Sequence, residues 1–362
     1  MSVSLHTPLC DLLGCRYPVV QTAMGYVAGS SLVAATCNAG GFGFLAGVTI
    51  PADRVEAEIL RVKELTGDKP FGLNFHMFQP NAQQLLDLAV KHRIRAVSYG
   101  RGPDKKVIGR LRDAGIVCMP TVGALRHAQK AIELGANVVT VQGGEGGGHT
   151  GKVPTTILLP QVVDAVNVPV VAAGGFYDGR GLVAALAYGA QGIAMGTRFL
   201  MTRDSGVPEA TLARYVATRD AGQIVVSPLV DGMPQRMIPN EYLAMLQKAS
   251  PFKRLRIALK LSLAWKAQTG MTSAHALKVL WQGMHGDDAG SLAQTVMAAN
   301  APMLLQRSMV AGHPDEGVMA SGQVAALIGR LDSCEEVIAG IVRVAGERLG
   351  VLDAMARGST DG

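Results

Sequence analysis

VVAAGGFYDGRGLVAALAYGAQGIAMGTRFL, residues 170–200, contains one complete copy of the pattern that decides the fold. A short aliphatic run ends at Gly174 and Gly175, a segment with helical spacing follows at 179–190, and a second aliphatic run follows at 191–199. A strand, a helix and a strand in this order are typical of a parallel βαβ unit. The stretch therefore predicts two parallel strands joined by a helix.

The same alternation runs through the first two hundred residues. Helical spacing separates the aliphatic runs, for example at 52–67 and 81–92, and Gly67, Gly115 and Gly135 stand where helices should end. Eight such units close most naturally into a (β/α)8 barrel, or TIM barrel. We therefore predict an α/β fold with a barrel over residues 1–205. Its predicted strands lie at 17–24, 41–47, 70–76, 94–100, 116–122, 137–143, 168–175 and 191–199.

The pattern changes after about residue 205. A helix is predicted over 208–220, an extended and turn-rich segment over 223–239, and a basic helical stretch over 250–268. Ser333 and Glu336 match the S-x-x-E capping box that begins a helix. We predict a mostly helical C-terminal domain in two parts: a helical and extended addition at 206–330 that covers the substrate, and a C-terminal helix at 331–362 that returns to the barrel.

Composition and charge exclude several classes of protein. The 362 residues are 48% hydrophobic and 17% charged, which favours a large buried core. The five cysteines form no CxxC pair, so we expect neither a disulfide framework nor a metal site. A net charge of +6 favours a basic pocket for an anionic small molecule over a nucleic-acid surface.

The N-terminal residues and the hydropathy pattern bear on location. No basic segment followed by an apolar one stands at the N-terminus, and no apolar stretch reaches the roughly 18 residues of a membrane span. We therefore expect no signal peptide, no membrane partner and a cytoplasmic protein.

Polar and glycine-rich residues follow the predicted strands. In a parallel barrel the active site lies at the carboxyl ends of the strands, where this chain places Asn74, Gln142 and the loop GGEGGGHTG (143–151). The glycines after the last two strands lie where barrels commonly bind phosphate through backbone N–H groups. Simpler alternatives remain: Asn74 could cap a helix, and the Gly174–Gly175 pair could form a tight turn.

Two nucleotide-binding motifs fail in the glycine loop. Gly146, Gly151 and Lys152 have the spacing of a P-loop, but Val153 stands where the motif needs Ser or Thr. A dinucleotide fingerprint would need a glycine at the position of His149. His149 is therefore the candidate for chemistry, because an imidazole at a strand end can accept or donate a proton.

Three motifs carry a resemblance to a known family: YPVVQTAMGYVAGSSLVAATCNAGGFG (17–43), QGGEGGGHTG (142–151) and the stretch at 170–200. They resemble the nitronate monooxygenase family, also called the 2-nitropropane dioxygenase family, over roughly 8–200. The segment ASGQVAALIGRLDSCEEVI (320–338) is also similar to it. The resemblance implies a TIM barrel with an added helical domain that binds FMN.

The resemblance also implies roles for individual residues. His149 matches the family's catalytic histidine. Amides would hydrogen-bond the flavin, glycines of the loop would let it lie against the cofactor, and the end of the first strand would pass close to the flavin ring. The residues after the last two strands would bind the FMN phosphate. The implied cofactor-binding residues are Ala23, Met24, Asn74, Gln142, Gly147, Gly148, Gly174, Gly175, Met195, Gly196 and Thr197.

Motifs in the second half of the chain bear on the reaction. VDGMPQR (230–236) and VMAANAPMLL (296–305) resemble the flavin-dependent branch of the family in bacterial steroid C/D-ring degradation, which reduces or dehydrogenates a bicyclic CoA thioester. We therefore predict an FMN-dependent oxidoreductase of a bulky CoA thioester, with His149 transferring the proton. The alternatives are a nitronate monooxygenase that uses O2, an NAD(P)H:quinone reductase, and a non-catalytic flavin-binding protein.

The basic stretch at 250–268 predicts a binding surface for the phosphates of CoA through Lys253, Arg254 and Arg256. The alternative is an amphipathic helix with a solvated basic face. Nucleic acid is disfavoured because no aromatic platform accompanies the charge. NAD(P)H is one candidate electron donor, and the sequence leaves a homodimer open.

Overall fold

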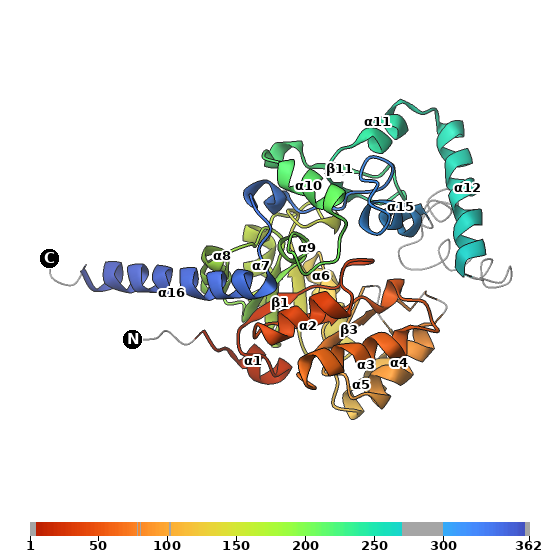
Figure 1. Cartoon of the computed structure of the whole chain (residues 1–362). Helices are drawn as coiled ribbons and strands as arrows, with labels where there is room; N and C mark the ends of the chain where they lie inside the picture. Colours follow the sequence, from red (N-terminus) through yellow and green to blue (C-terminus); the bar gives the residue numbers. More distant parts are fainter. Residues whose placement is uncertain (1–4, 78, 80, 101–102, 270–299, 359–362) are drawn as a thin grey trace.

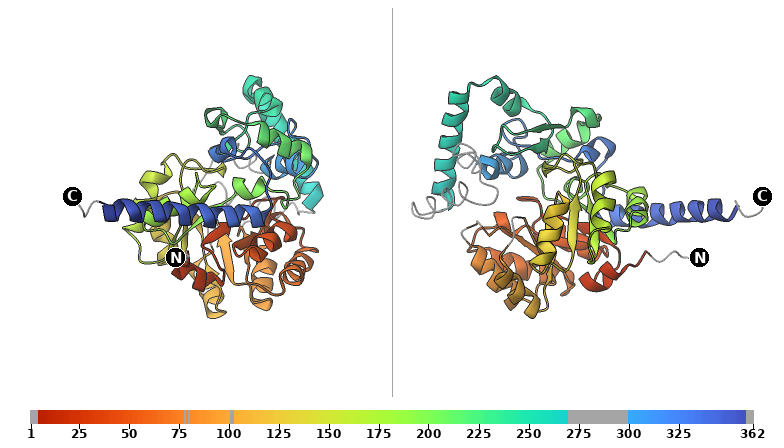
Figure 2. Two further views of the ribbon diagram at one scale, coloured as in Figure 1. Left: turned by 60° about the vertical axis from the view of Figure 1, so that its left-hand side comes forward. Right: turned by 180° about the vertical axis from the view of Figure 1, so that it is seen from behind.

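A computed structural model describes residues 5–77, 79, 81–100, 103–269 and 300–358 of the chain. It contains a barrel of parallel strands ringed by helices, with a second group of helices beside one end of the barrel (Figure 1). Helix α12 lies at the outer edge of that second group, and the C-terminal helix projects from the opposite side (Figure 2).

The barrel strands occur in all eight predicted runs. The run at 116–122 is divided into two short strands around Met119 and Pro120, because proline has no N–H to donate to a ladder. Its two halves pair with β4 on one side and β7 on the other, which closes the sheet into a TIM barrel. The strands are β1 (Val19–Gln21), β2 (Phe42–Leu45), β3 (Gly72–Phe75), β4 (Ala96–Tyr99), β5 (Val117–Cys118), β6 (Thr121–Val122), β7 (Val139–Gln142), β9 (Val170–Ala173) and β10 (Gly192–Met195).

Helices cover the outside of the barrel. Gly67, Gly115 and Gly135 all have positive φ, which confirms that these glycines end helices. The helices of the barrel region are α1 (Pro8–Leu13), α2 (Ser30–Asn38), α3 (Val55–Thr66), α4 (Ala82–Lys91), α5 (Lys105–Asp113), α6 (Leu125–Glu133), α7 (Thr155–Val163), α8 (Gly179–Ala187) and α9 (Thr197–Leu200), with one 3-10 turn at η1 (Gly47–Thr49).

A glycine makes room for a large side chain between two neighbouring strands of the barrel. The Phe44 ring occupies the space beside Gly72, where an added Cβ would lie 2.2 Å from the ring. Leu9 and Leu13 of α1 join the same buried cluster. Leu9 lies 2.8 Å from the position of a Cβ on Gly192, the first residue of β10. Helix α1 therefore covers the amino ends of the strands and leaves the carboxyl ends for the site.

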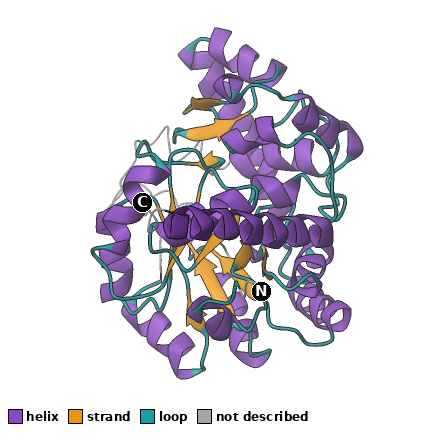
Figure 3. Cartoon of the chain, turned by 90° about the vertical axis from the view of Figure 1, so that its left-hand side faces the viewer, coloured by secondary structure: helices purple, strands orange, loops and turns teal. Residues whose placement is uncertain are grey.

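The addition after the barrel has a core of its own. Val230, Leu243, Leu246 and Leu304 are buried together in it. A three-stranded antiparallel sheet with the order β11-β12-β8 links it to the barrel, because β8 belongs to the glycine loop (Figure 3). The elements are β8 (Gly148–His149), α10 (Glu209–Ala217), η2 (Ala221–Gln223), β11 (Val225–Ser227), β12 (Gln235–Met237), α11 (Glu241–Lys248), α12 (Pro251–Thr269), α15 (Asn300–Met309) and η3 (Gln323–Leu327).

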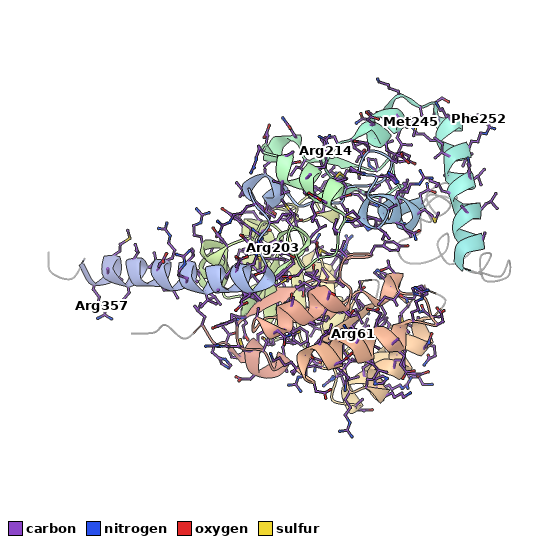
Figure 4. All side chains as sticks on the ribbon, in the orientation of Figure 1. Arg61, Arg203, Arg214, Met245, Phe252 and Arg357 are labelled. Atoms are coloured by element: carbon purple, nitrogen blue, oxygen red, sulfur yellow. The ribbon has the colours of Figure 1, made fainter. Side chains whose placement is uncertain are left out.

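The last helix, α16 (Cys334–Gly358), packs against α8 and α2. The Ser333 N–H donates to the Glu336 carboxylate at 2.7 Å, and the Glu336 N–H donates to Ser333 Oγ at 3.1 Å, which confirms the capping box. Gly179 permits the contact with α8, since a Cβ there would lie 2.3 Å from the Ile341 carbonyl oxygen. Beyond Leu349 the helix is exposed on all sides, and Arg357 projects from its outer end (Figure 4).

All five cysteines are free thiols. In the described part of the chain, each helix is too short or too polar to cross a lipid bilayer.

Candidate active site

The ends of β9 and β10 lie side by side, since Ala173 pairs with Ala194. Gly174 and Gly175 follow β9 with φ of +90° and +87°, a conformation that glycine adopts without strain. A Cβ on Gly174 would lie 2.9 Å from the Gly143 carbonyl oxygen, so Gly174 also lets the glycine loop pack against this turn. Gly175 is exposed.

Unpaired backbone donors gather at these two strand ends. The N–H groups of Gly175, Gly196 and Thr197 donate no hydrogen bond to any residue that the structure describes. Gly196 is half-buried and Thr197 is buried, and N–H groups in such positions normally have a partner. Two unpaired donors beside the exposed Gly175 therefore fit an anion such as a phosphate. The Thr197 hydroxyl accepts a hydrogen bond from the Gly322 N–H at 2.9 Å, which ties this turn to the segment before η3.

The two predicted amides differ in what they contact. Asn74 Nδ2 donates to the carbonyl oxygen and the hydroxyl of Ser98 at 3.1 and 3.0 Å, so Asn74 is not a helix cap. Its Oδ1 accepts no hydrogen bond within the described residues and is available to a ligand N–H or O–H. Gln142 Nε2 donates to the His149 carbonyl oxygen at 3.0 Å and so helps to position the loop.

The glycine loop is held by protein contacts on several sides. Gly147 is pressed against the backbone at 321–322, where a Cβ would lie 2.5 Å from the Gly322 nitrogen. This contact explains why position 147 has no side chain. Gly148, with φ of +67°, faces open space and leaves room for a ligand.

Arg236 and Glu145 fix the base of the loop. The Arg236 guanidinium donates to the Gly144 carbonyl oxygen from Nε at 3.1 Å and from Nη2 at 2.8 Å. Burial lowers the pKa of Arg236, and the nearby Glu145 carboxylate opposes this shift. Glu145 in turn accepts from the backbone N–H and the hydroxyl of Thr155, the first residue of α7. The loop is thus clamped between the barrel and the addition.

Three predicted residues line the strand ends on the β1 and β10 side. Ala23 and Met24 are partly exposed directly after β1. Met24 Sδ lies 3.4 Å from the position that a Cβ on Gly196 would take, so glycine there allows the close approach of Met24. The Met195 side chain is buried in the core at 2% exposure, so this residue can reach a ligand only through its backbone.

His149 lies in a cluster with Asp231 and Gln235, which we call the His149 cluster. His149 Nε2 is 2.7 Å from Asp231 Oδ2 and 3.1 Å from Gln235 Nε2. The Gln235 amide also donates to the same carboxylate oxygen. Strand pairing sets this geometry, because His149 stands opposite Gln235 where β8 pairs with β12. The His149 side chain is 52% exposed, whereas that of Asp231 is 3% exposed.

The sequence pattern alone did not indicate Asp231, Gln235 and Arg236 as site residues. All three belong to the VDGMPQR segment, which carried a resemblance but no assigned role. The available signal was a carboxylate, an amide and a guanidinium within six residues of a turn-rich stretch. Nothing local indicates that this stretch pairs with the glycine loop 82 residues earlier.

Helix α12 lies away from the barrel strands (Figure 1). Arg254 Nε and Nη2 donate to the carbonyl oxygens of Leu246 and Gln247 at 2.9 and 3.2 Å, so its guanidinium caps the end of α11. Lys253 and Arg256 are exposed on α12. Phe252 of the same helix also faces solvent (Figure 4). Two of the three predicted phosphate-binding side chains, Lys253 and Arg256, are therefore at the surface. The third, Arg254, is hydrogen-bonded to the end of α11.

Comparison with known proteins places these features in one family. A family model described as Nitronate monooxygenase matches residues 6–87 and 81–343. A Rhodococcus jostii protein named (3aS,4S,5R,7aS)-5-hydroxy-7a-methyl-1-oxo-octahydro-1H-indene-4-carboxyl-CoA dehydrogenase is 46% identical over 352 residues, 97% of this chain and 99% of its own. A Mycobacterium tuberculosis protein of the same name is 45% identical over 351 residues, 93% of this chain and 95% of its own.

A solved structure is also similar over nearly the whole chain. FabK from Thermotoga maritima is 28% identical, with a TM-score of 0.76, and the match covers 97% of this chain and 99% of FabK. The family match, the two dehydrogenase relatives and the barrel agree with one another. The chain therefore belongs to the nitronate monooxygenase family of oxidoreductases.

Proposed function

We propose that this member of a flavin-dependent family is an FMN-dependent dehydrogenase of a bulky CoA thioester. One observation carries the proposal. N–H donors without a protein partner, at Gly175, Gly196 and Thr197, occur together with an exposed histidine on the adjacent loop. The first group suits a phosphorylated cofactor, and the second suits proton transfer. The names of the two dehydrogenase relatives support the substrate class.

The residues at the barrel mouth fit FMN. The turns after β9 and β10 would hold its phosphate through backbone N–H groups, with Gly174 and Met195 contributing backbone only. Asn74 Oδ1 and the Gln142 amide would hydrogen-bond the flavin, while Ala23, Met24, Gly147 and Gly148 border the space beside it. Bound FMN would supply two-electron redox chemistry by exchanging a hydride with the substrate.

The name of the relatives defines a bond that such a site can oxidise. It describes a hydroxyl at position 5, next to the carbon that carries the thioester, so the alcohol is β to the thioester carbonyl. Oxidation of this alcohol removes a hydride from carbon and a proton from oxygen. His149 would accept the hydroxyl proton, and N–H groups of the glycine loop would hold the thioester carbonyl oxygen and so orient the substrate. In the reverse direction, the same groups serve a reductase.

The CoA portion of the substrate would reach the addition. Lys253 and Arg256 are exposed and positively charged, which suits the phosphates of CoA, while Arg254 would hold α11 in place. A CoA thioester and five free thiols both suit a cytoplasmic location. That NAD(P)H is an external electron donor remains a prediction. That the protein forms a homodimer also remains a prediction.

The test is anaerobic mixing of the oxidised holoenzyme with substrates. A bicyclic β-hydroxyacyl-CoA should bleach the visible flavin band within one turnover, and the matching free acid should bleach it far more slowly. The matching β-ketoacyl-CoA mixed with the reduced enzyme tests the reverse direction in the same apparatus, and an enoyl-CoA tests reduction of a carbon–carbon double bond instead. Failure of every CoA thioester to change the flavin spectrum would reject the proposal.

The family model supports a second candidate, nitronate oxidation. Alkyl nitronates with O2 are the matching substrates. Fast flavin turnover only with these compounds would favour the second candidate over the CoA thioester. Yellow protein that no donor reduces would favour a non-catalytic flavin-binding role.

A further inference from the structure

The His149 imidazole has two different nitrogen environments. Nε2 points at the Asp231 carboxylate at 2.7 Å. Nδ1 makes no hydrogen bond within the described residues, and about half of the side chain is exposed. The two ring nitrogens of histidine are chemically distinct, and the partner of one nitrogen decides which proton state the other adopts.

The carboxylate determines the tautomer. Ionised Asp231 only accepts hydrogen bonds, so the short contact requires a proton on Nε2 of His149. Gln235 Nε2 donates to the same Asp231 oxygen, and the 3.1 Å separation of the two nitrogens reflects two donors that converge on one acceptor. In the neutral imidazole, Nδ1 is then left with a lone pair toward the open side of the cluster.

The position of Asp231 is fixed by the turn that carries it. Asp231 Oδ1 accepts from the Met233 N–H at 3.1 Å, and the Gly232 N–H donates to the Pro228 carbonyl oxygen at 2.9 Å. Asn300 of α15 donates to the Val230 carbonyl oxygen at 3.2 Å. Donors from Met233, His149 and Gln235 therefore satisfy a carboxylate that is only 3% exposed, as a buried charge requires.

We infer that Asp231 is a positioning residue that holds His149 in the Nε2–H tautomer, so that Nδ1 is the atom that exchanges a proton with the substrate. The inference rests on the proposed function for the identity of the proton. In the oxidative direction, Nδ1 would accept the hydroxyl proton, and bound flavin would supply the acceptor for the hydride from the carbon that bears this hydroxyl. The imidazolium that forms lies against the Asp231 carboxylate, which stabilises its positive charge.

Nitrogen-15 NMR of the holoenzyme tests the tautomer without turnover. Two-bond proton–nitrogen spectra of histidine-labelled protein distinguish Nε2–H from Nδ1–H, and the His149→Ala variant identifies the signals of His149. We expect a protonated Nε2 and an unprotonated Nδ1. A protonated Nδ1 in the neutral imidazole would overturn the inference while leaving the substrate proposal intact.

Asp231→Asn is the decisive variant. The new amide can keep the acceptor for the Met233 N–H and present its NH2 group to His149, which should move the ring proton to Nδ1. We expect that tautomer change, unchanged flavin binding, and a kcat at least about 100-fold lower with a similar KM. The melting temperature should fall by only about 2–4 °C, because Gln235 Nε2 loses its acceptor. An unchanged tautomer together with unchanged kcat would reject the role.

Gln235→Leu is the matched control at the same carboxylate. It removes one donor to Asp231 and leaves the contact between Asp231 and His149, so the tautomer should stay Nε2–H and kcat should fall by less than about tenfold. A tautomer change in Gln235→Leu but not in Asp231→Asn would assign the effect to the amide. Asp220→Asn, at the residue that caps the separate turn η2, should change neither readout. A correct tautomer with no activity on any CoA thioester would reject the proposed function alone.

Discussion

Asp231 Oδ2 lies 2.7 Å from His149 Nε2, although 82 residues separate the two positions in the chain. One residue belongs to the glycine loop after β7, and the other to the turn between β11 and β12. The histidine therefore acquires its partner only when the addition folds onto the barrel. This contact makes the addition part of the proposed chemistry.

Replacement of His149 tests its chemical role. His149→Ala should leave the flavin bound, because the cofactor contacts expected at the strand ends remain, and should lower turnover about 100-fold or more through loss of the proton acceptor. Steady-state kinetics with a flavin absorbance spectrum give both quantities. His313→Ala, at an exposed position in a loop, is the control. Unchanged turnover in His149→Ala would make His149 a packing residue.

Arg236 should stabilise the glycine loop. Arg236→Met removes two hydrogen bonds to the Gly144 carbonyl oxygen and one to that of Ile224. We expect the free energy of unfolding to fall by about 1.5–3 kcal/mol, the usual range for bonds to a charged donor. Urea unfolding measures the change. Arg219→Met removes one exposed bond of 3.3 Å to Gly329 and should cost less; equal losses would contradict the clamp.

Replacement of Gly175 tests the phosphate site, and a second glycine variant controls for backbone strain. Gly175→Ala forces an alanine to φ of +87°, which should cost about 1–2 kcal/mol of stability and move the N–H groups beside it. Gly67→Ala imposes a similar strain at φ of +62° far from the site. Only Gly175→Ala should weaken FMN binding, by about tenfold or more if about 1.4 kcal/mol of the interaction is lost. Equal FMN dissociation constants in the two variants would exclude a phosphate site at this turn.

The exposed charges of α12 should act on binding and not on chemistry. Lys253→Glu and Arg256→Glu should each raise KM for a CoA thioester by up to about fivefold with kcat unchanged, as expected for solvent-exposed ion pairs. The effect should shrink at high salt. Arg348→Glu on α16, which is also exposed, serves as the control. A KM independent of both α12 charges would place the CoA phosphates elsewhere.

Much of the barrel was predictable because its signals are local. The run at 170–173 is aliphatic since both faces of a parallel strand are buried, and the turn at Gly174 and Gly175 needs glycine for its positive φ. The capping box of Ser333 and Glu336 is equally local, because its two hydrogen bonds join residues three positions apart. Short-range rules therefore locate these elements correctly.

The His149 cluster was only half predictable. His149 stands out after its glycines, but Asp231 and Gln235 depend on an antiparallel pairing between segments distant in the chain. Gly147 shows the same limit, since its contact with the backbone at 321–322 is tertiary. Arg254 looked like its basic neighbours in the sequence, yet helix geometry turns it toward the end of α11.

A crystal structure of the protein with riboflavin 5′-phosphate tests the central claim most directly. We expect phosphate oxygens within hydrogen-bonding distance of the N–H groups of Gly175, Gly196 and Thr197, with Nδ1 of His149 facing the reactive side of the flavin ring. A phosphate bound elsewhere, or an imidazole turned away from the ring, would contradict this claim.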